Sequence, residues 1–124
     1  LDADKLQTLF RKALGKDDLT VKLESLANAD LAAMVTEDEQ ARRFKDMSRM
    51  YGQSFPMPDR FTLVLNRRCP TVQALAARNA DDETTSLLCQ QVYDLARMAA
   101  QPLEAEEITT FLTRSQKLLE LLVK

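Results

Sequence analysis

LLCQQVYDLA at residues 87–96 and ITTFLTRSQKLLELLVK at residues 108–124 are the stretches that decide the fold of this chain. Both have the apolar spacing of amphipathic helices, and Pro102 lies in the short turn between them. Apolar positions in the second stretch recur at alternating three- and four-residue steps, which is typical of helices in bundles and coiled coils. Such a helix pair carries more apolar surface than it can cover by itself, so we predict self-association. The predicted interface consists of Leu88, Val92, Leu95, Ile108, Phe111, Leu112, Ser115, Leu118, Leu119 and Leu122.

The composition is that of a single, mostly helical globular domain. The 124 residues suffice for one core, 45% of them are hydrophobic, 29% are charged, and only two are glycine. The first residue is Leu1 rather than Met, so we expect a fragment of a longer chain. Within the single domain 1–124 we expect an α/β body over residues 1–80 and dimerisation helices over 81–124.

Periodicity and capping signals predict an α+β fold with a small sheet of about three strands. Alternating apolar residues predict a strand over 19–24, and the segments 32–35 and 61–65 are the other candidates. The sequence Thr36-Glu37-Asp38-Glu39 has the pattern of a capping box and predicts a helix over about 37–51. Further helices are predicted over 3–14, 70–78, 82–100 and 104–123.

The residue types give little support to an enzymatic role. The chain has no histidine, which excludes a Ser-His-Asp or Cys-His arrangement built within it, and it has no glycine-rich phosphate loop. We interpret the acidic clusters 37–39 and 81–83 as helix caps rather than metal ligands. Cys69 and Cys89 are expected to be reduced thiols of a cytoplasmic protein. We therefore expect no catalytic residue, no metal, no cofactor and no membrane span in this chain.

The predicted helix over 37–51 has an apolar stripe made of Phe44, Met47, Met50 and Tyr51, with basic residues beside it. Such a stripe is ordinary core in most helices. Methionine also packs against many shapes and recurs on adaptable binding surfaces, so an exposed binding site is the alternative. Residues 40–80 hold eight basic and two acidic side chains, which raises nucleic acid as a partner. The acidic flanks and the lack of interleaved aromatic residues argue against that partner.

Short segments spread over nearly the whole chain resemble the C-terminal domain of the bacterial heat-shock protein 90 family (high-temperature protein G). The similar segments are LFRKALG at 9–15, DMSRMY at 46–51, FTLVLN at 61–66, LCQQVYDLA at 88–96 and FLTRS at 111–115. Their order and spacing are more specific than any one of them. Cys69 departs from the family, which usually has a polar or small residue there.

The resemblance implies the dimerisation domain of an ATP-dependent chaperone of the stress response, acting in protein folding. It implies that the last helices of two protomers form a four-helix bundle. It also implies that Phe44, Met47, Met50 and Tyr51 contact unfolded or partly folded client protein, and that ATP and Mg²⁺ bind an N-terminal domain outside this chain. The alternatives are a purely structural homodimerisation domain and, less favoured, a nucleic-acid-binding module.

Overall fold

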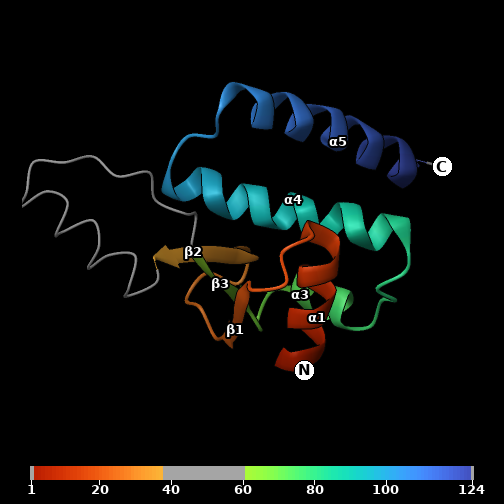
Figure 1. Cartoon of the computed structure of the whole chain (residues 1–124). Helices are drawn as coiled ribbons and strands as arrows, with labels where there is room; N and C mark the ends of the chain where they lie inside the picture. Colours follow the sequence, from red (N-terminus) through yellow and green to blue (C-terminus); the bar gives the residue numbers. More distant parts are fainter. Residues whose placement is uncertain (1, 38–60, 124) are drawn as a thin grey trace, which may run out of the picture.

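The computed structural model describes residues 2–37 and 61–123. These residues form an α+β fold in which a three-stranded sheet is covered by helices, as the sequence predicts. Figure 1 shows α4 between α5 on one side and the sheet and α1 on the other. No helix among these residues is long and apolar enough to cross a membrane.

The first helix, α1, spans Ala3–Leu14 and has the caps that the sequence predicts. The side chain of Asp2 accepts hydrogen bonds from the backbone N–H groups of Asp4 and Lys5, which have no partner inside the helix. Gly15 ends the helix with φ 65°, a conformation that glycine adopts without strain. The buried side chains of α1 are Leu6, Leu9 and Phe10.

The sheet is mixed, and β3 (Phe61–Asn66) is its central strand. It pairs in parallel with β1 (Thr20–Glu24) and antiparallel with β2 (Ala33–Glu37). Side chains alternate between the two faces of a strand, so Leu63 and Leu65 share one face. Both are fully buried, and α1 and α4 cover this face. The register places Val21 and Val35 beside Leu63, and Leu23 and Ala33 beside Leu65.

The predicted start of the helix over 37–51 is wrong. Thr36 and Glu37 are the last residues of β2, where they pair with Thr62 and Phe61 of β3. Pairing with the central strand prevails there over the local capping signal, and a β-branched threonine suits a strand. The rest of the predicted helix lies outside the described residues. The short helix α3 (Pro70–Ala76) also ends two residues before the predicted boundary at Arg78.

Asn66, at the end of β3, organises the connection between β1 and β2. Its side chain is fully buried, and its Oδ1 accepts hydrogen bonds from the N–H groups of Leu26 (3.0 Å) and Arg68 (3.1 Å). Its Nδ2 donates to the carbonyl oxygens of Asn28 (2.9 Å) and Leu31 (2.8 Å). Because an amide side chain offers two donor hydrogens and two acceptor lone pairs, Asn66 uses its full capacity.

Replacing Asn66 by alanine should therefore leave several backbone groups near residues 26–31 without partners. We expect Asn66→Ala to lower the free energy of unfolding by about 3 kcal/mol. Asn79→Ala is the matched control, because the Asn79 side chain is exposed and accepts one hydrogen bond, from the N–H of Asp81. The control should cost less than about 1 kcal/mol in urea denaturation. Equal losses for the two variants would contradict the assigned role of Asn66.

Candidate functional site

The hairpin formed by α4 (Glu83–Ala100) and α5 (Ala105–Val123) is the part of the fold that the sequence assigns to association. The helix α4 lies between the sheet and α5, and α5 packs mainly against α4 (Figure 1). Asp82 caps the start of α4 by accepting the N–H of Thr85, and hydrogen bonds from Arg78 and Thr85 lower the pKa of the Asp82 carboxyl. Leu103, in the turn between the helices, is buried.

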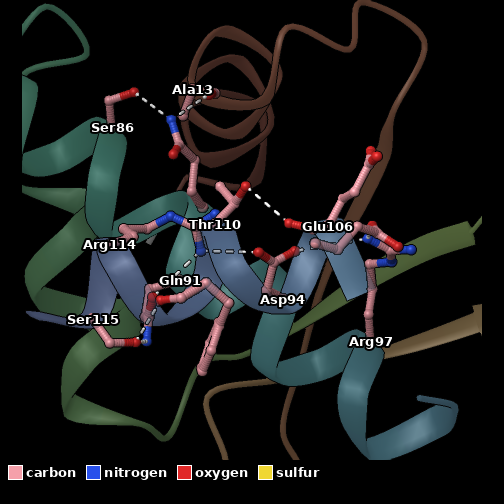
Figure 2. A network of polar contacts seen from close by, with 12 residues as sticks. Ala13, Ser86, Gln91, Asp94, Arg97, Glu106, Thr110, Arg114 and Ser115 are labelled. Carbon is pink, nitrogen blue, oxygen red and sulfur yellow. Dashed lines mark hydrogen bonds and ion pairs between the residues drawn. The ribbon is translucent and has the colours of Figure 1, made fainter. Parts of the chain in front are cut away.

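Polar and charged groups make up much of the contact between α4 and α5. The Nη1 atom of Arg114 on α5 lies 2.9 Å from Oδ2 of Asp94 on α4, and the two side chains are only 8% and 12% exposed. The same Nη1 atom donates to Oε1 of Gln91 at 3.3 Å. Figure 2 shows Arg114 reaching across to both residues. Arg114 therefore joins the middle of α5 to two residues of α4.

A second ion pair lies nearer the turn. Arg97 on α4 contacts the carboxylate of Glu107 on α5, and its Nη1 lies 3.8 Å from Oδ1 of Asp94. The hydrogen bond from Arg97 is the main reason why the pKa of Glu107 is lowered. The Glu107 carboxylate also accepts a hydrogen bond from the N–H of Glu104, and this bond caps the start of α5. Charge pairing and helix capping thus coincide at this end of the hairpin.

Removing one partner of a buried ion pair is strongly destabilising because the other charge stays buried without compensation, whereas replacing both partners by apolar residues costs little. We expect Arg114→Met to lower the free energy of unfolding by about 3 kcal/mol, because Asp94 would stay buried without its nearest counter-charge. The double variant Asp94→Leu with Arg114→Met should recover most of this loss. The measurement is urea denaturation at a fixed protein concentration.

A matched control is available in the same pair of helices. Lys117 on α5 pairs with Glu83 on α4 at 2.6 Å, but their side chains are 50% and 74% exposed. Lys117→Met should therefore cost less than about 1 kcal/mol. A double variant that is no more stable than Arg114→Met would show that Arg114 acts through something other than its pair with Asp94.

One side of the hairpin is apolar and exposed. On α4 it is formed by Leu88, Gln91, Leu95 and Met98, and on α5 by Leu112, Ser115, Leu119 and Leu122. Each set follows the spacing i, i+3, i+7 and i+10, which places its members on one side of a helix. A hydrogen bond of 2.8 Å from Gln91 Nε2 to Ser115 Oγ brings the two sets side by side. We call these eight residues the hairpin face.

The apolar members of the hairpin face retain much of their surface. Leu95 is 52% exposed, Leu112 60%, Leu119 55% and Leu122 77%. No charged residue belongs to the face. Contiguous exposed leucines of this kind are uncommon on soluble monomers and mark surfaces for association.

The structure divides the ten residues predicted for the interface into buried, half-buried and exposed groups. Val92 (6% exposed) packs in the core beside the sheet, and Leu118 (8% exposed) is buried in the hairpin. Both are satisfied within the protomer and leave little surface for another chain. Leu88, Phe111 and Ser115 are half-buried, while Leu95, Ile108, Leu112, Leu119 and Leu122 are exposed.

Sequence reasoning missed Gln91, Met98 and the pair formed by Asp94 and Arg114. Gln91 and Met98 could have been found from their spacing, because they lie three residues after Leu88 and Leu95. The ion pair gave no such signal, because its two residues are twenty positions apart and charged residues are normally exposed. The predicted client-binding residues Phe44, Met47, Met50 and Tyr51 lie outside the described residues.

The opposite side of the hairpin has a hollow of about 470 Å³ next to the end of α1. Its charged lining residues are Lys16, Arg97 and Arg114 together with Asp94, Glu106 and Glu107. Positive and negative charges balance there, so the lining selects neither anions nor cations. In the described parts of the chain, no group of three His, Cys, Asp or Glu side chains could hold a metal ion.

Cys69 and Cys89 are both buried as free thiols. Burial raises the pKa of the Cys89 thiol to about 12, although the nearby charge of Arg78 acts in the opposite direction. Cys89 is therefore protonated at neutral pH, and a protonated thiol is a poor nucleophile.

Comparison of the sequence with protein-family models and with curated proteins found no match.

Proposed function

We propose that this chain is the homodimerisation module of an ATP-dependent molecular chaperone of the heat-shock protein 90 family. The exposed, uncharged hairpin face is the observation that carries the dimerisation part of this proposal. The chaperone part depends on the resemblance, and so do a cytoplasmic location and the binding of ATP and Mg²⁺ by a domain outside residues 1–124.

A second copy of the chain is the occupant that best fits the hairpin face. Each side chain buried there would gain favourable transfer free energy, about 1 kcal/mol for a leucine that is half exposed beforehand. Two hairpins related by a two-fold axis would place the same face of each protomer against the other, as in most homodimers. Four helices would then surround one apolar centre, which is the geometry of a four-helix bundle.

The buried pair of Asp94 and Arg114 supports the same proposal. It fixes α5 on α4 without using the leucines of the hairpin face. The isolated protomer therefore has a defined hairpin whose apolar face is still open. A preformed surface of this kind binds with less loss of conformational entropy than one that must first become ordered.

A charge in the middle of the hairpin face tests the dimer directly. Leu119→Asp would place one carboxylate from each protomer near the two-fold axis, in apolar surroundings. We expect the dimer to weaken by about 3 kcal/mol or more, which is more than a hundredfold in dissociation constant. Thr113→Asp is the control, because Thr113 is exposed on α5 and lies outside the hairpin face.

Sedimentation equilibrium at micromolar concentration is the measurement. Wild type and Thr113→Asp should have twice the chain mass of 14.1 kDa. The average mass of Leu119→Asp should fall toward that of the single chain. Circular dichroism should show all three to be folded, because Leu119 is not part of the core. A folded wild-type chain that sediments as a monomer at this concentration would refute the proposed dimer.

The proposed client contact through Phe44, Met47, Met50 and Tyr51 needs a separate test. The purely structural dimerisation domain is the alternative to it, and there the same methionines would be ordinary core. If they contact clients, Met47→Ser with Met50→Ser should change the melting temperature little, and the full-length chaperone should suppress less aggregation of a partly unfolded protein. If they are core, the two replacements should cost several kcal/mol, on the order of 4. A large loss of stability with unchanged chaperone activity would refute the client contact and leave the dimer untouched.

A further inference from the structure

A polar pair, Gln91 and Ser115, interrupts the otherwise apolar hairpin face. Along α4, Gln91 lies between Leu88 and Leu95 in the stripe, and along α5 Ser115 lies between Leu112 and Leu119. Both polar residues are half-buried, and they bond to each other across the hairpin (Figure 2). An apolar face intended only for tight association has no need of polar groups at this position.

The neighbouring residues hold Gln91 and Ser115 in fixed orientations. Arg114 donates to Oε1 of Gln91, so the amide nitrogen must point toward Ser115. The hydroxyl of Ser115 donates to the carbonyl oxygen of Phe111 at 2.8 Å and accepts from Gln91. Arg114 is itself fixed by its buried pair with Asp94. The orientation of the polar pair is thus fixed through Arg114, which also pairs with Asp94 and joins the two helices.

The hydrogen-bonding capacity of this pair is not exhausted within the protomer. Gln91 uses one of its two amide hydrogens among the described residues, and the Ser115 oxygen keeps one acceptor lone pair. Oε1 of Gln91 also keeps one lone pair, because Arg114 is its one donor among the described residues. Each protomer therefore has one free donor and two free acceptor positions, which makes the pair self-complementary. Across a two-fold axis, the Gln91 amide of each protomer can donate to the partner's Ser115.

We propose that Gln91 and Ser115 form a polar layer across the dimer, which fixes the register and the two-fold arrangement of the two hairpins. This inference rests on the proposed dimerisation, and it names the two residues that select one arrangement of the protomers in the dimer. Leucines pack against one another in many offsets, whereas a buried donor must meet an acceptor. A single polar layer in an apolar helical interface specifies register and oligomeric state at a cost in stability.

The test replaces the layer by apolar residues of similar size, in Gln91→Leu with Ser115→Ala. A spin label on Glu120→Cys reports the distance between protomers, because Glu120 is exposed on α5 and both natural cysteines are buried. With the wild-type layer we expect one narrow distance and a single dimeric species. Without it we expect a distance distribution at least about twice as broad, and species larger than the dimer, because the register is no longer specified.

The control is Thr109→Ala with Thr113→Leu, which makes the same kind of changes on the part of α5 outside the hairpin face. It should keep the narrow distance and the dimeric mass. Ser115→Ala alone provides a second variant if the double replacement does not fold, and it should broaden the distance distribution to a smaller degree. If the wild type is a dimer and the variant without the layer keeps the same narrow distance and the dimeric mass, this inference is wrong and the proposed dimer is unaffected. A monomeric wild type would overturn both.

Discussion

The buried ion pair between Asp94 and Arg114 is the interaction on which the architecture of the hairpin face depends. It joins the outer helix α5 to α4, and Arg114 and Leu118 are the two buried side chains of α5 between Ala105 and Val123. A charged pair in a low-dielectric contact has a preferred geometry, whereas leucines tolerate many offsets. The pair therefore sets how α5 lies on α4, and through that the shape of the hairpin face.

This arrangement gives the two helices of the hairpin different tasks. One side of α4 closes the core over Leu63 and Leu65 of the sheet, while another side carries Leu95 and Met98 of the hairpin face. The helix α5 contributes little to the core, and its apolar residues are mostly exposed. The sheet and α1 can thus fold around α4 as one unit, and the proposed association uses surface that this unit does not need.

Polar side chains that are buried or half-buried form specific hydrogen bonds at two places in the fold. Asn66 uses every hydrogen-bonding group of its side chain to hold the connection between β1 and β2. On the hairpin face, Gln91 has a second amide hydrogen and Ser115 a second lone pair that the bonds among the described residues do not use. A satisfied polar group specifies the fold of one chain, and a self-complementary group that is only partly satisfied can specify how two chains meet.

The sequence by itself determined the elements with strong local signals: the helix capped by Asp2 and Gly15, the apolar strand predicted over 61–65, and the two long helices before and after Pro102. Their periodicity and caps are properties of neighbouring residues. Tertiary structure decided the rest, since β3 draws Thr36 and Glu37 into a strand despite their capping pattern. It also decided that Val92 and Leu118 face inward while Leu119 and Leu122 face outward. A helical stripe shows which residues are apolar, but only the packing of α4 between the sheet and α5 determines which of them a protomer covers by itself.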